Sequence, residues 1–143
     1  MIKAAIDIGT VTARLLVGEI VDGRVDTLGY ASRITNLGEG LTSSGLISEA
    51  AYSRLFDALL DFTEVLSGVE VELSCEGRGE FMMIPVRSVA TSAMRDATNA
   101  SEVLTRLAKR GFDIEVISGK TEAELSFKGT LSGFGTGGRG LVS

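Results

Sequence analysis

Residues 4–17 read AAIDIGTVTARLLV: an apolar strand that ends in Asp-x-Gly-Thr and is followed at once by a second apolar strand. This pattern is typical of a loop that holds a phosphate beside a metal ion. Gly9 lets the backbone turn tightly and approach a ligand, while backbone N–H groups and the hydroxyls of Thr10 and Thr12 can donate to phosphate oxygens. Asp7 offers the hard oxygen ligand that Mg²⁺ prefers. The alternative is an ordinary β-hairpin with a structural aspartate.

The composition is that of one folded domain. The chain has 143 residues, of which 44% are hydrophobic and 23% are charged, and this is enough to bury a core. No apolar run approaches the roughly 20 residues that cross a bilayer. Met1-Ile2-Lys3 leads directly into a strand, without the pattern of a signal peptide. We therefore expect a cytoplasmic protein that does not bind a membrane.

Two features of the composition limit the chemistry. The chain has no histidine, which excludes Ser-His-Asp and Cys-His triads and His-ligated zinc. A general base must then be a carboxylate, a lysine or a tyrosine. The formal net charge of −5 argues against nucleic-acid binding, which usually needs a basic excess. A polyanionic ligand is compatible with this charge only at a locally basic pocket.

The apolar pattern predicts three strands followed by alternating helices and strands. Strands are predicted at 3–10, 13–21, 24–35 and 112–117, helices at 49–67, 100–110 and from about 118–121 to 131, and β-like stretches at 69–75 and 82–91 around a turn at 77–79. Asp22-Gly23 is a strong hairpin signal. The order β-β-β-α-β-α-β-α predicts an α/β fold, an actin-like (ribonuclease H-like) half-domain with a mixed central sheet flanked by helices.

Residues that cap helices support these boundaries. Ser48 suits the N-cap of the first helix, and Gly68 suits its end. Asn99 and Glu102 form a pair that resembles a capping box at the start of the second helix.

Four distinctive blocks of sequence occur along the chain. They read DIGT at 7–10, RITNLGEG at 33–40, VATSAMRDA at 89–97 and EVISGKTEAEL at 115–125. Together they resemble the N-terminal domain of the exopolyphosphatase/guanosine pentaphosphate phosphohydrolase (Ppx/GppA) family, over essentially the whole chain. The first block is shared with actin-like kinases and chaperone ATPases, whereas the last two are much more specific.

The resemblance implies hydrolysis of terminal phosphoanhydride bonds in inorganic polyphosphate or guanosine pentaphosphate, with Mg²⁺ or another divalent cation. It implies that Glu122 orients or deprotonates the attacking water and that Arg95 contacts phosphate. Glu122 also falls in the first turn of a predicted helix, where backbone N–H groups and the dipole favour anions. The alternatives are a solvated helix charge for Glu122 and a surface salt bridge, for example with Asp96, for Arg95.

The turn departs from the family pattern at one position. The family usually reads Gly-Ser-Asn-Ser, whereas this chain has Gly9-Thr10-Val11-Thr12. Both threonines keep a hydroxyl, but the valine has no side-chain donor. The segment 72–83 also looks longer than the family's usual connection.

The resemblance further predicts that residues 1–143 are the N-terminal actin-like domain of a larger two-domain enzyme, inactive as an isolated fragment. Family members follow Leu-Val with a second phosphate turn and a second domain, and this chain stops at Ser143 before that turn. The expected partners are the substrate and the C-terminal actin-like domain, and a homodimer is also compatible. Two alternatives stay open, namely an actin-like ATP-dependent kinase half-domain and a non-catalytic sensor of polyphosphate or the alarmone.

Overall fold

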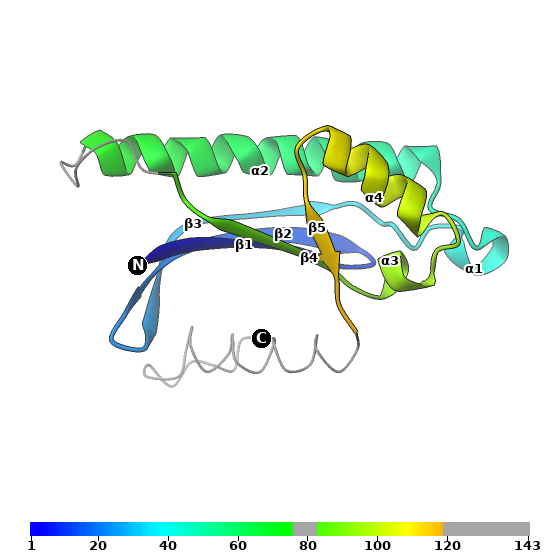
Figure 1. The fold of residues 1–143 in the computed structure, drawn as a ribbon, viewed down its shortest axis with the longest axis horizontal. Helices are drawn as coiled ribbons and strands as arrows, with labels where there is room; N and C mark the ends of the chain where they lie inside the picture. Colours follow the sequence, from blue (N-terminus) through cyan, green and yellow to red (C-terminus); the bar gives the residue numbers. More distant parts are fainter. Residues whose placement is uncertain (76–82, 119–143) are drawn as a thin grey trace.

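The computed structural model describes residues 1–75 and 83–118 as a five-stranded mixed sheet with the two longest helices on one face (Figure 1). The strands are β1 (Ile2–Ile8), β2 (Thr12–Val21), β3 (Arg24–Ile34), β4 (Val86–Ala90) and β5 (Ile114–Val116); the helices are α1 (Leu41–Ser44), α2 (Glu49–Cys75), α3 (Ser92–Asp96) and α4 (Ala100–Lys109). The strand order is β3-β2-β1-β4-β5. β2 pairs antiparallel with β1 and β3, whereas β4 pairs parallel with β1 and β5.

This topology confirms the predicted order of strands and long helices. The two short helices, α1 and α3, were not predicted, and the helix predicted at 118–131 lies outside the described residues. The hairpin between β2 and β3 is also confirmed. Asp22 and Gly23 both have positive φ, 50° and 78°, as a two-residue type I′ turn requires.

The core lies between the sheet and α2, which runs along the length of the sheet (Figure 1). Alternate residues of β1 and β2 are buried toward α2, because successive side chains of a strand point to opposite faces. These residues are Ala4, Ile6, Ile8, Ala13, Leu15 and Val17, and on α2 they meet the buried Leu55, Leu59 and Phe62. Asp7 therefore points to the other face of the sheet, where it is exposed.

The prediction that the long helix ends at Gly68 is wrong. α2 continues to Cys75, and residues 69–75 form its last two turns instead of a strand. Val69 and Leu73 are buried because they extend the helical spacing of apolar residues, and packing overrides the preference of valine for strands. Gly29 of β3 makes room for this contact, since a Cβ there would lie 3.0 Å from Cγ2 of Val69.

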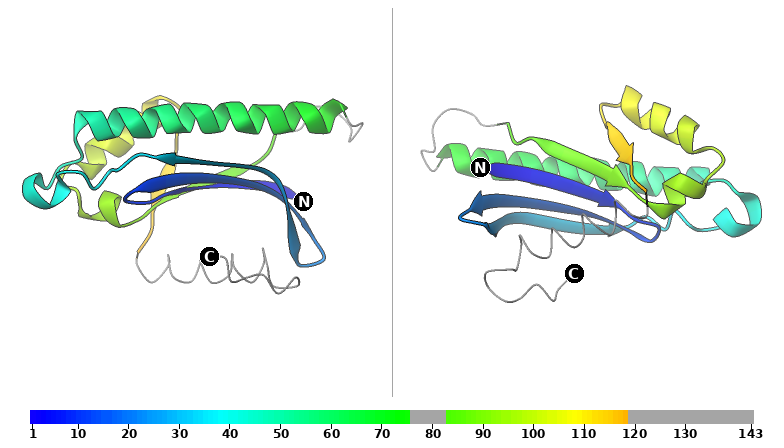
Figure 2. Two further views of the ribbon diagram at one scale, coloured as in Figure 1. Left: turned by 180° about the vertical axis from the view of Figure 1, so that it is seen from behind. Right: turned by 60° about the horizontal axis from the view of Figure 1, so that its bottom comes forward.

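The four helices in the described residues lie over one face of the sheet and at one of its ends. Figure 2 shows α2 and α4 on the same face of the sheet, and α1 beside α3 at one end of it. A hydrogen bond joins the residues that follow α1 and α3, from the N–H of Thr98 to the carbonyl oxygen of Gly45 at 2.7 Å. None of the helices within residues 1–75 and 83–118 is long and apolar enough to cross a membrane.

Candidate functional site

Three of the sequence blocks meet at one edge of the sheet. β1, β4 and β5 are parallel, so their carboxyl ends lie together. Two hydrogen bonds continue this pairing beyond the strands. The N–H of Thr91 donates to the Ile8 carbonyl oxygen at 3.2 Å, and the N–H of Ile117 donates to the Ala90 carbonyl oxygen at 3.0 Å. Ligands of open α/β sheets bind outside the carboxyl ends of the strands, which makes this edge the candidate site.

The turn between β1 and β2 is the first component of the site. The N–H of Gly9 donates to the carbonyl oxygen of Thr12 at 3.0 Å, and a Cβ on Gly9 would lie 3.0 Å from that oxygen. The close approach explains the glycine. Within the described parts of the chain, no backbone acceptor takes the N–H of Thr10 or Val11. These two groups are oriented by the turn and can donate to an anion.

Ser92 is a site residue that the sequence analysis did not single out. Its Oγ lies 2.9 Å from Oγ1 of Thr10, and either hydroxyl can be the donor. The two residues are 82 positions apart in the chain, so no local pattern predicts the contact. The only signal was the position of Ser92 in the block at 89–97. The pair places two hydroxyls side by side at the edge, where both can reach one phosphate group.

Arg95 lies at the same edge, on the last turn of α3. Its Nη1 donates to the carbonyl oxygen of Ile117 at 2.6 Å, so its guanidinium spans from α3 to the segment that follows β5. Ser118, the last described residue of that segment, belongs to the block at 115–125 that also contains Glu122. Glu122 itself lies outside the described residues. The structure therefore places Arg95 on the helix that follows β4, at the same end of the sheet as the turn, and leaves the placement of Glu122 as a prediction.

Asp7 is one strand position before the buried end of β1, on the exposed face of the sheet. Its register partners are Arg14 on β2 and Val89 on β4. In the described ranges, no group of three or more His, Cys, Asp or Glu residues is arranged to hold a metal. Mg²⁺ nevertheless often binds through one or two carboxylates and completes its shell with water and substrate phosphates. A single aspartate beside a phosphate turn fits that type of site.

Residues 35–40, which we name the brace, support the turn from behind. The N–H groups of Thr35 and Asn36 both donate to the carbonyl oxygen of Val11 at 2.9 Å. The N–H of Gly38 donates to the carbonyl oxygen of Thr10 at 3.1 Å. The carbonyl group of Thr10 points to the brace, so the N–H of Val11, which belongs to the same trans peptide, points away from it.

Arg54 of α2 in turn holds the brace. Its Nε donates to the carbonyl oxygen of Thr35 at 2.7 Å, and its Nη2 contacts Oε1 of Glu39 at 2.9 Å. Asn36 between them adopts a positive φ of 49°, a conformation that costs energy for any residue with a Cβ. The charged contacts of Arg54 help to hold the brace in this conformation, and they connect the turn to the long helix.

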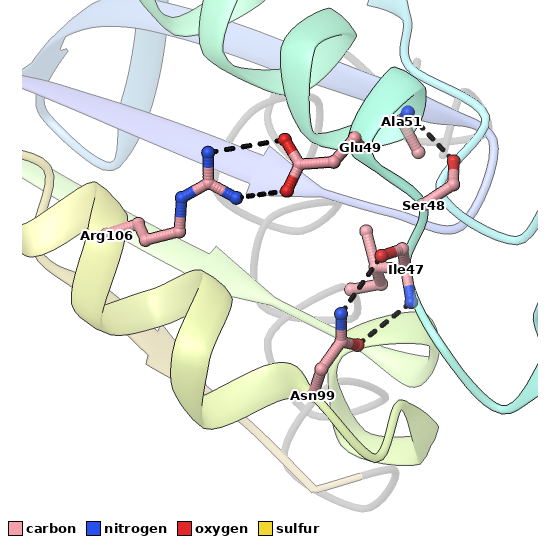
Figure 3. A network of polar contacts seen from close by, with 6 residues as sticks. All are labelled: Ile47, Ser48, Glu49, Ala51, Asn99 and Arg106. Atoms are coloured by element: carbon pink, nitrogen blue, oxygen red, sulfur yellow. Dashed lines mark hydrogen bonds and ion pairs between the residues drawn. The ribbon is translucent and has the colours of Figure 1, made fainter.

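A second polar network joins the segment before α2 to the start of α4 (Figure 3). The amide of Asn99 pairs with both backbone groups of Ile47, accepting from its N–H at 2.9 Å and donating to its carbonyl oxygen at 3.0 Å. The capping box predicted for Asn99 and Glu102 is therefore wrong, since Asn99 makes no side-chain cap bond to α4. Its amide is committed to the neighbouring chain segment, which satisfies two loop groups at once.

The start of α2 shows the remaining contacts of this network (Figure 3). Oγ of Ser48 accepts the N–H of Ala51 at 3.0 Å, which confirms the predicted N-cap. Glu49 forms two contacts with Arg106 of α4, at 2.6 and 3.3 Å, and the guanidinium stacks 3.8 Å from the ring centre of Tyr52. The hydrogen bond to Glu49 raises the pKa of Arg106 above its usual value. These contacts keep α2 and α4 together behind the candidate site.

The sheet order, the helices and the strand–turn–strand at the carboxyl edge define an actin-like, ribonuclease H-like half-domain. Solved structures agree. A Ppx/GppA family member from Aquifex aeolicus is 31% identical with a TM-score of 0.69, covering 85% of this chain and 36% of its own. An exopolyphosphatase from Cytophaga hutchinsonii is 33% identical with a TM-score of 0.68, covering 90% of this chain and 38% of its own.

The sequence comparisons give the family. Exopolyphosphatase 2 of Mycobacterium tuberculosis and the guanosine-5′-triphosphate,3′-diphosphate pyrophosphatase of Vibrio vulnificus are each 34% identical over 97% of this chain. The model of the Ppx/GppA phosphatase family matches residues 16–143, and the chain belongs to this family. The chain spans 43% and 26%, respectively, of the lengths of these two relatives.

Proposed function

We propose that this chain forms the phosphate-binding half of an enzyme that hydrolyses terminal phosphoanhydride bonds of inorganic polyphosphate, guanosine pentaphosphate or both. One observation carries the proposal: the turn with its Thr10–Ser92 hydroxyl pair, and the short helix that bears Arg95, both lie at the carboxyl ends of β1 and β4. These are donors of the kind that phosphoryl transfer uses to stabilise charge on the transferred group. Membership of the Ppx/GppA family and the names of its relatives support the reaction class.

In the proposed mechanism, the turn binds and orients the terminal phosphate. The N–H groups of Thr10 and Val11 and the hydroxyls of Thr10 and Thr12 donate to its oxygens, and Arg95 offsets its negative charge. Glu122 accepts a proton from a water as that water attacks the terminal phosphorus. The bond from phosphorus to the bridging oxygen breaks, and the shortened chain leaves with the electron pair. A carboxylate base agrees with the absence of histidine from the sequence.

We also propose that the enzyme uses a divalent cation, Mg²⁺ or another. Asp7 is the residue that would hold it, with water and substrate oxygens as the other ligands. When bound, such an ion offsets the charge of the phosphates during transfer. Arg14, the register partner of Asp7, adds positive charge to the same face of the sheet.

The proposed enzyme is larger than this half-domain. The relatives named above are more than twice as long as the part that matches this chain. We propose that residues 1–143 are the N-terminal domain of a two-domain enzyme and that a second actin-like domain completes the cleft. A closed cleft excludes water and strengthens the charge interactions inside it, which a single half-domain in bulk solvent cannot do.

The test is phosphate release by the full-length protein with Mg²⁺, using long-chain polyphosphate and guanosine pentaphosphate as alternative substrates. We expect Glu122→Gln to lower kcat by about 10²- to 10⁴-fold, as loss of a general base does, with KM nearly unchanged. Glu124→Gln is the matched control, because residues two apart on the helix predicted from the sequence would not share a face. We expect it to keep turnover close to wild type.

The other outcomes are equally clear. If Glu122→Gln turns over at the wild-type rate, Glu122 is not the base. Tight binding of polyphosphate without phosphate release by the wild-type protein would instead favour a sensor. Phosphate transfer from Mg-ATP to a sugar, with no release from polyphosphate, would favour an actin-like kinase.

A further inference from the structure

We propose that Gly38 of the brace is a positioning residue that fixes the direction of the Thr10 hydroxyl at the candidate phosphate site. The inference rests on the proposed function, because it concerns how the turn presents that hydroxyl to a phosphate oxygen. It assigns a role to a residue that does not itself touch the ligand.

The methyl branch of Thr10 lies against Gly38. A Cβ at position 38 would lie 2.5 Å from Cγ2 of Thr10, far inside contact distance, and 3.9 Å from the Thr10 carbonyl oxygen. The backbone of Gly38 does not itself demand glycine, because its φ is not among the positive values found in the described residues. The methyl group of Thr10 is therefore the obstacle to a side chain at position 38.

The hydroxyl branch of Thr10 lies against Ser92, with 2.9 Å between the two oxygens. Both branches are carried by the same Cβ, so they turn together about one staggered torsion. Moving the methyl away from position 38 must swing the hydroxyl away from Ser92. The free space at Gly38 and the contact with Ser92 thus select a single rotamer of Thr10.

The brace cannot easily retreat to relieve a clash. The N–H of Gly38 donates to the Thr10 carbonyl oxygen at 3.1 Å, and the neighbouring Glu39 is held by Arg54 at 2.9 Å. A side chain at position 38 would therefore be accommodated mainly by Thr10. Serine at position 10 would remove the methyl and with it the need for glycine at position 38. The geometry predicts a coupling between these two positions.

The test uses four forms of the full-length protein: wild type, Gly38→Ala, Thr10→Ser and the double variant. Binding of tripolyphosphate is measured by calorimetry, alongside melting temperature and the kcat and KM for polyphosphate. We expect Gly38→Ala to weaken tripolyphosphate binding by about 10- to 100-fold, the range for losing a hydrogen bond to a charged group. Thr10→Ser keeps the hydroxyl but loses the methyl that helps to fix its direction, so we expect a smaller loss of affinity than in Gly38→Ala. The double variant should bind as Thr10→Ser does, because the alanine at position 38 then has no methyl group to displace.

Gly68→Ala is the matched control, because a Cβ at position 68 meets no atom within 4 Å. It should leave tripolyphosphate binding unchanged. Normal binding by Gly38→Ala would overturn the inference, and so would weak binding that Thr10→Ser fails to rescue. If Gly38→Ala does not fold, a folded double variant that binds as Thr10→Ser does supports the inference, and an unfolded double variant overturns it. A wild-type protein that neither binds tripolyphosphate nor releases phosphate would refute the proposed function itself.

Discussion

At the scale of single residues, the candidate site depends on contacts between positions that are distant in the chain. Sequence reasoning predicted Gly9 and Thr10 correctly as parts of a tight turn, because a glycine between two apolar strands is a local signal. It could not predict that Ser92 lies against Thr10, or that Gly38 lies behind it. Those contacts arise only when the parallel strands place their carboxyl ends together.

Thr35 illustrates a residue whose side chain and backbone have different roles. Its N–H and carbonyl group hold the turn and Arg54, whereas its Oγ1 is buried without a hydrogen-bond partner in the described structure. An unpaired buried hydroxyl is destabilising. Valine has nearly the same shape and keeps both backbone contacts.

We therefore expect Thr35→Val to raise the free energy of unfolding by about 1 kcal/mol, measured by urea denaturation. Thr91→Val is the comparison, because the buried Thr91 hydroxyl donates to the Ile8 carbonyl oxygen at 3.5 Å, and we expect it to lower stability. Equal losses in both variants would mean that the Thr35 hydroxyl has a partner after all.

At the scale of elements, the strands were predictable and the end of the long helix was not. Alternating burial in β1 and β2 follows directly from alternating residue types. Gly68 looked like the end of a helix because glycine often follows one. In the fold it lies on the exposed side of α2, while Val69 and Leu73 continue the buried side. The helix continues because β3 offers Val69 a surface to pack on, and the sequence of the helix alone does not reveal that surface.

The continuation of α2 can be tested with two glycine substitutions. Gly68→Ala should stabilise the protein by about 0.5–1 kcal/mol, because alanine is the better residue inside an exposed helix. Gly29→Ala should destabilise it, since the new Cβ would lie 3.0 Å from Cγ2 of Val69. Thermal unfolding of both variants measures the difference. A loss of stability in Gly68→Ala would restore the prediction that the helix ends there.

One of the two predicted helix caps forms, and the other is replaced by a contact with a distant residue. Ser48 caps α2 as predicted, because an N-cap is a contact within a few residues. Asn99 occupies the position before α4, yet its amide binds Ile47 instead. Spacing alone predicts a capping box, but it does not show that the fold places the backbone of Ile47 within reach of the Asn99 amide.

At the scale of the whole molecule, charge decides where a polyanion can bind. The chain carries a formal net charge of −5, so a phosphate chain is repelled by most of the surface. Binding must depend on local donors, and the carboxyl edge concentrates them in the turn and Arg95. We therefore propose that the half-domain binds phosphate at this edge.

The most direct test is tripolyphosphate affinity of the full-length protein over a range of salt concentrations, comparing Arg95→Ala with Arg87→Ala. Arg87 is the matched control. Its guanidinium forms an ion pair with Glu115 at 3.1 Å, and the residue lies near the start of β4, away from the carboxyl ends of the strands. We predict that Arg95→Ala weakens binding and makes its salt dependence shallower, because one fewer cation engages the ligand, while Arg87→Ala changes neither. Unchanged affinity of Arg95→Ala at every salt concentration would contradict the claim that phosphate binds at this edge.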